Sequence, residues 1–194
     1  MAKKEVSAKI KLQIPGGQAT PAPRRRAGLA DGLGACSVDL RPLAAALSAA
    51  SKPLFVIGGG AAKAGADLAA VLETCGAACF ETYAGRGVVP WDYPLNFGAA
   101  LARPSSAQIV AQADCVVAIG TELAEVDLWR AHLGHSCPLY RIDIDPECLA
   151  DMQRAEMAIL ARAEEAMASL RPLMAASASQ WQARSVTHQR GLWQ

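Results

Sequence analysis

The chain has 194 residues, of which 52% are hydrophobic and 19% charged, so disorder of the whole chain is excluded. At ~100–200 residues per domain, it holds one domain with extensions or two small domains. No uncharged stretch approaches the ~18 residues of a membrane-spanning helix. The Lys-bearing start also lacks the apolar run of a secretory signal peptide. We therefore expect a cytoplasmic protein that does not bind membranes.

The first 26 residues form a basic arm on an acidic body. They carry seven Lys or Arg and one Glu, whereas residues 27–194 carry twelve basic and seventeen acidic residues. Residues 6–14 alternate apolar and polar side chains, the period-two pattern of a half-buried strand. Residues 24–35 are rich in Arg, Gly and Ala, which is typical of a linker. A strand without partners adds little stability, so residues 1–35 are expected to be dispensable for folding of the body.

From residue 39 onward, predicted helices alternate with short apolar strands. Asp39 is expected to cap the first helix, which ends before Pro53. The predicted strands are 54–57, 78–82, 115–119, 139–144 and 157–160. The predicted helices start after 60 (with Gly76 as the stop), after 104, at 122, near 146 and at 163. Residues 176–194 show no strong period and are expected to form a C-terminal tail or truncated linker.

This order predicts an α/β fold, because wholly apolar strands need helices on both faces of their sheet. We expect an open, doubly wound parallel sheet of five to six strands, Rossmann-like, in a domain that spans residues 36–175. The strand ends at Gly58, Gly120 and Asp145 then lie along one carboxyl edge, where ligands bind in such sheets.

Gly58, Gly59 and Gly60 follow the first strand and open a helix, and two interpretations stay open. Their N–H groups could meet a phosphate at the helix N-terminus. Alternatively, they form a tight turn that requires positive φ. The full dinucleotide-binding fingerprint fails, since its sixth position is Lys63 rather than glycine.

Two more groups at the predicted edge could contact a ligand. Asp143 and Asp145 could accept hydrogen bonds from a ribose, and Asp145 could equally cap the helix that follows it. In Gly85-Arg86-Gly87, the cation could clamp a diphosphate, or it could pair with an acidic residue and shape the loop.

The sequence contains neither a G-x-S-x-G nucleophile elbow nor a phosphate-binding P-loop. His132, His135 and Cys137 offer three potential metal ligands within six residues, but zinc sites usually use two paired ligand motifs. We therefore predict no catalytic residue and no metal site. The two imidazoles are interpreted as solvent-facing groups at a helix end.

Five ordered blocks carry a resemblance to a known family: PLFVIGGGA at 53–61, GRGVVP at 85–90, PLNFG at 94–98, ADCVVAIGTEL at 113–123 and RIDIDP at 141–146. Together they resemble the central domain of thiamine diphosphate-dependent enzymes of the acetolactate synthase and pyruvate oxidase group, over residues 39–175. The stretch 121–129 is most similar to 2-oxo acid decarboxylases, including the 5-guanidino-2-oxopentanoate type.

The resemblance implies a three-domain enzyme in which thiamine diphosphate binds between the first and third domains. A glutamate of the first domain activates the cofactor, and a G-D-G…N motif of the third holds Mg2+ and the diphosphate. Neither domain has a match in this sequence. The resemblance therefore implies a detached central domain of a decarboxylase or carboligase that is inactive alone. Its partners would be separately encoded flanking domains, and the parent enzymes are homo-oligomers.

In some members of the family, the central domain binds FAD or another nucleotide such as ADP. The residues that fall at the blocks lining that site are Gly58, Gly59, Gly60, Gly85, Arg86, Gly87, Thr121, Asp143 and Asp145. Arg162 departs from the pattern, because many members read G-D-A where this chain reads Ala-Arg-Ala. The alternative function is a non-enzymatic module that binds FAD or a nucleotide.

The basic arm has a likeness of its own. Residues 1–23 resemble the N-terminus of the bacterial large-subunit ribosomal protein of the GTPase-associated region. A lone strand without its sheet cannot bind ribosomal RNA as that family does. The chain is therefore interpreted as a fusion, natural or artificial, and association with the ribosome is the third and weakest hypothesis.

Overall fold

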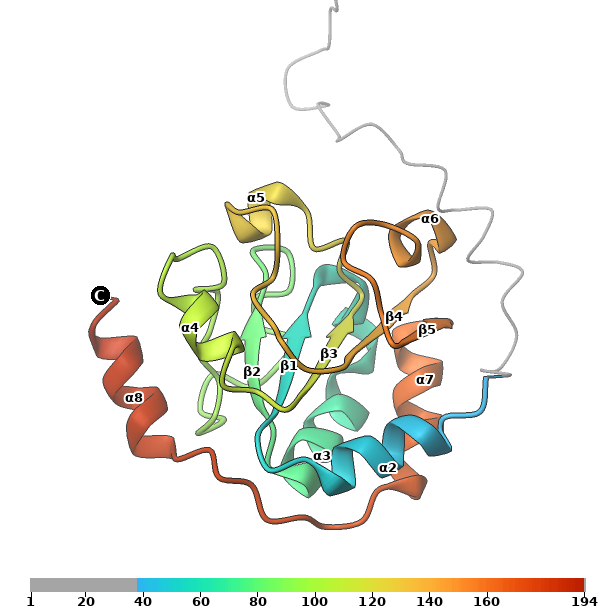
Figure 1. The fold of residues 1–194 in the computed structure, drawn as a ribbon. Helices are drawn as coiled ribbons and strands as arrows, with labels where there is room; N and C mark the ends of the chain where they lie inside the picture. The colour runs from blue at the N-terminus through green and yellow to red at the C-terminus, as the bar shows by residue number, and fades with distance from the viewer. Residues whose placement is uncertain (1–37, 194) are drawn as a thin grey trace, which may run out of the picture.

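The computed structural model describes residues 38–193 and shows a parallel sheet covered by helices on both faces (Figure 1). The strands are β1 (Pro53–Ile57), β2 (Ala78–Glu81), β3 (Cys115–Ile119), β4 (Leu139–Asp143) and β5 (Met157–Leu160). Their spatial order is β2-β1-β3-β4-β5, so the winding direction reverses between β1 and β3. The predicted doubly wound α/β fold is confirmed, with five strands.

The helices form a layer on each face of the sheet. One face carries α2 (Arg41–Ala49), α3 (Gly65–Cys75) and α7 (Ala163–Leu170), and the other carries α4 (Ser106–Val110) and α8 (Ala183–Gly191). One-turn helices α5 (Glu125–Leu128) and α6 (Pro146–Leu149) follow β3 and β4, and 3-10 turns η1 (Gly59–Ala64) and η2 (Arg171–Leu173) flank α3 and α7. None of the helices within residues 38–193 is long and apolar enough to cross a membrane.

Both faces of the central strands are buried, which explains their unbroken apolar sequence. In β1, Phe55 and Ile57 pack toward α3 and α7, whereas Leu54 and Val56 pack toward α4 and α8. All four are fully buried. Burial of such a side chain stabilises the folded state by roughly 1.5–3 kcal/mol. The side chains of one strand therefore attach helices to both faces of the sheet.

One predicted helix boundary is wrong. The predicted cap at Asp39 is present one residue before the assigned N-cap, Leu40, because the Asp39 carboxylate accepts hydrogen bonds from the N–H and guanidinium of Arg41, the first residue of α2. The helix expected from Glu122 to His132 is a single turn, because Trp129 adopts a left-handed conformation (φ 51°) that ends α5. The other predicted stop, Gly76, is correct and has φ 60°.

The segment 176–193, which shows no sequence period, is an ordered strap that completes the second face. The Trp181 indole N–H donates to the carbonyl of Pro53 at 2.8 Å, and the Trp193 indole donates to the Ser105 hydroxyl at 2.9 Å. Between them, Val186 of α8 is buried in the same core. We call this segment the C-terminal strap. The predicted strand and linker of the basic arm lie outside the described residues.

Candidate functional site

The loops after β1 and β3 cross in backbone contact at the carboxyl edge. A Cβ added to Gly58 would lie 2.1 Å from the carbonyl oxygen of Gly120, and one added to Gly120 would lie 2.5 Å from the nitrogen of Ala61. Gly120 has φ 58°, but none of Gly58, Gly59 and Gly60 has positive φ. The expectation that this turn requires positive φ is therefore wrong. Glycine is needed there because two backbones pass too closely for a side chain.

The same crossing uses two of the three predicted phosphate donors. The Gly58 N–H donates to the carbonyl of Ile119 at 2.9 Å, and the Gly60 N–H donates to that of Gly120 at 3.0 Å. These bonds fasten the start of η1 to the end of β3. An anion would have to compete with both carbonyls for these donors.

The loop after β2 is shaped by Glu81 rather than by Arg86. The buried Glu81 carboxylate accepts hydrogen bonds from the N–H groups of Gly87, at 3.0 Å, and Val89, at 3.2 Å. Gly85 lies against the end of β1, where an added Cβ would meet the Ile57 carbonyl oxygen at 2.2 Å. Arg86 is exposed on this loop.

A small cavity of about 220 Å3 lies at the ends of β1, β3 and β4. It brings together three parts of the chain that lie far apart in the sequence: the turn from Gly59 to Lys63, Gly120 and Asp143. One oxygen of the buried Asp143 carboxylate accepts a hydrogen bond from the Asp145 N–H at 3.0 Å. Arg162 also lines the cavity, and its Nε lies 3.6 Å from Oε1 of Glu165.

Asp145 and Thr121 belong to the scaffold around this cavity. Asp145 is the N-cap of α6, since its carboxylate accepts from the Glu147 N–H at 2.9 Å, which confirms the capping interpretation. The buried Thr121 hydroxyl accepts from the Leu123 N–H at 3.1 Å and supports the left-handed residue Leu123. Neither side chain lines the small cavity.

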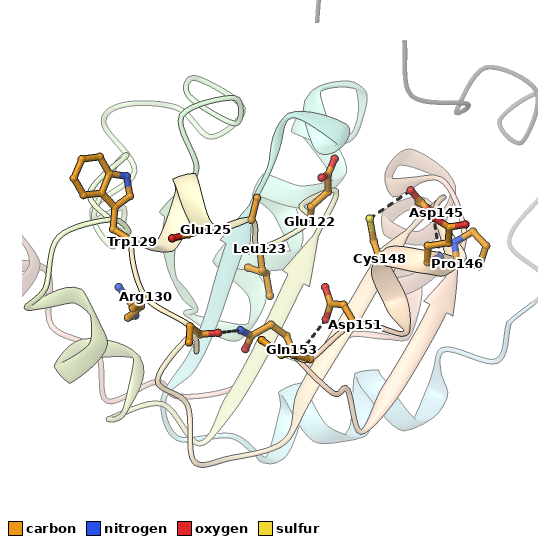
Figure 2. Close-up of a pocket in the computed structure, with 14 residues that line it drawn as sticks. Glu122, Leu123, Glu125, Trp129, Arg130, Asp145, Pro146, Cys148, Asp151 and Gln153 are labelled. Atoms are coloured by element: carbon orange, nitrogen blue, oxygen red, sulfur yellow. Dashed lines mark hydrogen bonds between the residues drawn. The ribbon is translucent and has the colours of Figure 1, made fainter. Parts of the chain in front are cut away.

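A much larger cleft, of about 1000 Å3, opens beside α5 and α6 (Figure 2). We call it the acidic cleft, because five carboxylates line it: Glu122, Glu125, Asp145, Glu147 and Asp151. Burial raises the pKa of Cys148 in its wall to about 12, and a hydrogen bond to Asp145 together with the surrounding negative charges adds to that shift. Burial also raises the pKa of Asp127, with a further contribution from Glu122. No local sequence pattern marks this cleft, because its carboxylates are scattered over two loops.

Buried Arg141 joins the two walls of the acidic cleft. Its guanidinium donates to the Asp151 carboxylate at 2.6 Å and to the carbonyls of Thr121 and Glu122 at 3.5 and 3.4 Å. The side chain is 1% exposed, so the ion pair is largely desolvated on the arginine side. Removing one partner of such a pair leaves a buried charge uncompensated, at a cost of ~3–5 kcal/mol. A charged residue inside an apolar strand is the sequence signal that could have identified it.

Comparison with known proteins decides the family of this domain. The sequence pattern of the family described as "Thiamine pyrophosphate enzyme, central domain" matches residues 40–170, about two thirds of the chain. This chain belongs to that family. The predicted resemblance is therefore confirmed for the body, and the match does not extend to the basic arm.

Individual relatives agree with the family. The central domain is 42% identical over 135 residues to a probable 2-ketoarginine decarboxylase of Pseudomonas aeruginosa, covering 70% of this chain and 24% of that protein. It is 32% identical over 126 residues to a pyruvate oxidase of Lactiplantibacillus plantarum, covering 64% and 21%. A crystal structure of an enzyme from Mycobacterium smegmatis, assigned as thiamin diphosphate-dependent, superposes with a TM-score of 0.55 at 25% identity over 71% of this chain and 28% of that one. The chain thus spans about a fifth to a quarter of the curated relatives it matches.

The described residues of this central domain do not fit a Mg2+–thiamine diphosphate site. Within residues 38–193, no group of three or more His, Cys, Asp or Glu side chains is placed to hold a metal ion. The expected helix end is wrong, because residues 129–138 form no helix. Of the two imidazoles expected to face solvent, His132 is exposed and His135 is half-buried. Burial lowers the pKa of His135, and His132 lowers it further.

Proposed function

We propose that this chain supplies the central domain of a thiamine diphosphate-dependent 2-oxo acid decarboxylase that acts on 2-ketoarginine. The observation that carries the proposal is the 42% identity to the 2-ketoarginine decarboxylase relative over nearly the whole body. The pyruvate oxidase relative is ten percentage points less similar over a comparable length.

In this proposal, the chain's own residues build a scaffold and do not touch the reacting atoms. The glycine crossing at the carboxyl edge and the Arg141 ion pair hold the edge loops in fixed positions. Thiamine diphosphate, when bound in flanking domains, supplies the decarboxylation chemistry. The proposed partners are those domains with Mg2+, in a cytoplasmic homo-oligomer.

A domain exchange tests this proposal. Residues 40–170 replace the matching segment of the Pseudomonas aeruginosa enzyme, and decarboxylation of 2-ketoarginine and of pyruvate is measured with thiamine diphosphate and Mg2+. We expect a chimaera of the parent's size that retains turnover of 2-ketoarginine, because the exchanged segment has only to fit between the flanking domains. The matched control carries the corresponding segment of the pyruvate oxidase and should retain less of this turnover. A chimaera that does not assemble, or that turns over 2-ketoarginine no faster than the control, would contradict the proposal.

We also propose a second, non-enzymatic capacity: binding of ADP or the ADP part of FAD at the carboxyl edge. What favours it is the small cavity, which combines the cation Lys63 with the strand-end carboxylate Asp143. Phosphate would lie near Gly58 to Gly60 and ribose hydroxyls near Asp143, where a carboxylate accepts their hydrogen bonds. The Arg162 departure from the family pattern stands against a full FAD site.

Calorimetric titration of ADP and FAD separates these readings. Gly59→Asp places a negative charge against the phosphate and should weaken binding more than tenfold, ~1.4 kcal/mol. Asp145→Ala removes the α6 cap and should change stability by ~1 kcal/mol without a comparable loss of affinity. If neither ligand binds the unmodified chain below millimolar concentration, the central domain is a scaffold only.

A further inference from the structure

Acidic side chains outnumber basic ones in the lining of the acidic cleft. Among the described residues, five carboxylates and one cation, Arg130, line it, and Glu125 and Glu147 are exposed. Arg130 donates to the carbonyls of Leu101, Leu128 and Leu133. Arg141 reaches the cleft only through its ion pair with Asp151. The carboxylates come from both walls, so a cation between them is attracted from two sides.

The same cleft exposes large apolar side chains. Trp129 is 75% exposed and Met152 is 73% exposed, one on each wall. Figure 2 shows the Trp129 indole directed away from the sheet at the margin of the cleft. Exposed apolar surface rimmed by charged groups marks interaction sites, and here it calls for an occupant that is both basic and apolar.

The chain carries a segment with this chemistry. The basic arm has a formal charge of +6 over residues 1–26. In its predicted strand, Lys9 and Lys11 alternate with Ile10 and Leu12, so an extended arm presents ammonium groups on one side and apolar side chains on the other. The charge and the apolar content of the arm both complement the cleft.

The linker is long enough for the arm to reach the cleft from the start of the described chain. Residues 27–37 span at most ~36–40 Å when extended. A body of this size has a radius of gyration of about 15 Å. Residues 12–26 of the arm add up to about 50 Å, so Lys9 and Lys11 can reach the acidic cleft around the surface of the body.

We propose that the basic arm docks in the acidic cleft of its own chain, with its lysines against the carboxylates and its apolar residues against Trp129 and Met152. Such a contact is an electrostatic attachment on the surface, which is weakened by salt. It is compatible with an arm that is dispensable for folding, and it does not depend on the proposed enzymatic function.

Zero-length carbodiimide crosslinking of the full chain tests the proposal, because the reagent joins a lysine directly to a carboxylate in contact with it. We expect peptides that link Lys9 or Lys11 to Glu125, Glu147 or Asp151, detected by mass spectrometry. Their yield should fall at least fivefold at about 0.5 M NaCl, where screening is strong. When chains of normal and heavy isotope composition are mixed, the masses of the two linked peptides show whether the arm and the cleft belong to the same chain.

Paired variants provide the control. Glu125→Gln with Glu147→Gln removes two exposed carboxylates from the cleft and should reduce the crosslinks to Asp151 severalfold. Glu73→Gln with Glu156→Gln removes the same charge from exposed positions outside it and should leave them unchanged. Links between light and heavy chains would replace self-docking with docking to a second copy. The proposal is also overturned if the arm lysines crosslink to Glu73 as often as to the carboxylates of the cleft, or if no crosslink of the arm is found.

Discussion

Gly58 and Gly120 bring the ends of β1 and β3 together so closely that neither position accepts a Cβ. Position 120 requires glycine for two reasons, because it has no space for a Cβ and because it adopts a left-handed conformation with φ 58°. The glycines of this edge are thus explained by packing within the domain, whatever ligand the edge binds.

Gly120→Ala should therefore destabilise the domain by ~2–4 kcal/mol, the sum of left-handed strain and overpacking. Gly87→Ala is the matched control, since Gly87 has φ 82° but no atom lies within 4 Å of its added Cβ. It carries only the conformational strain, ~1 kcal/mol. Urea unfolding measures both, and equal losses would show that the crossing adds nothing.

Cys148 should react with iodoacetamide slowly at pH 8, because its raised pKa leaves little thiolate. Asp145→Asn keeps the α6 cap but removes a negative charge and a thiol acceptor. The pKa of Cys148 should then fall, and alkylation should accelerate by about three- to tenfold. Site-resolved mass spectrometry follows the rate. The control variant is Glu73→Gln on α3, which removes a charge distant in the sequence from Cys148. If this variant accelerates alkylation of Cys148 as much as Asp145→Asn does, the electrostatic cause is refuted.

Among the elements, the C-terminal strap extends the domain past the family match, which ends at residue 170. Its aromatic residues join Phe80 and Phe97, which stack with their ring centroids 4.8 Å apart. The rings of Trp181 and Phe97 meet edge-on with their centroids 6.0 Å apart. The ring centroid of Trp193 lies 6.2 Å from those of Phe80 and Phe97. The strap thus covers apolar surface that α4 alone leaves open on the second face.

Trp181→Ala should lower the free energy of unfolding by ~2 kcal/mol, since it removes an aromatic contact and the hydrogen bond to Pro53. Leu192→Ala, 66% exposed in the same strap, should change it by less than ~0.5 kcal/mol. Chemical denaturation of both variants gives the comparison. Similar small losses would mean that the strap is not part of the cooperative unit.

For the whole molecule, we expect no decarboxylation of any 2-oxo acid by this chain alone, even with thiamine diphosphate and Mg2+. The reason is the donor set: the described residues bring no cluster of potential metal ligands together. Steady-state assays with 2-ketoarginine and pyruvate, compared with the cofactor alone in solution, test this. Turnover above that background would show that the domain contributes more than a scaffold.

Truncation to residues 36–194 provides a second test at this scale. The body's core lies within the described residues, so removal of the arm should cost less than ~1 kcal/mol in a thermal melt. A larger loss would show that the arm packs into the core instead of docking on the surface.

The sequence by itself determined the fold class, all five strands to within one residue at each end, the Gly76 stop and the Asp145 cap. It could do so because these features rest on local signals: unbroken apolar runs, a left-handed helix stop and a side chain that bonds its own backbone. The strand predicted over 78–82, for example, ends at Glu81 rather than at Thr82. The family followed from ordered blocks that lie at the strand ends.

Tertiary structure alone decided the acidic cleft, the Arg141 ion pair, the cause of the glycine crossing and the strap. Each depends on groups distant in sequence: Gly58 and Gly120, Arg141 and Asp151, or Trp181 and Pro53. No local period or propensity encodes such pairs. α8 escaped prediction for the same reason, because its single buried residue, Val186, meets a face built by strands more than forty residues earlier.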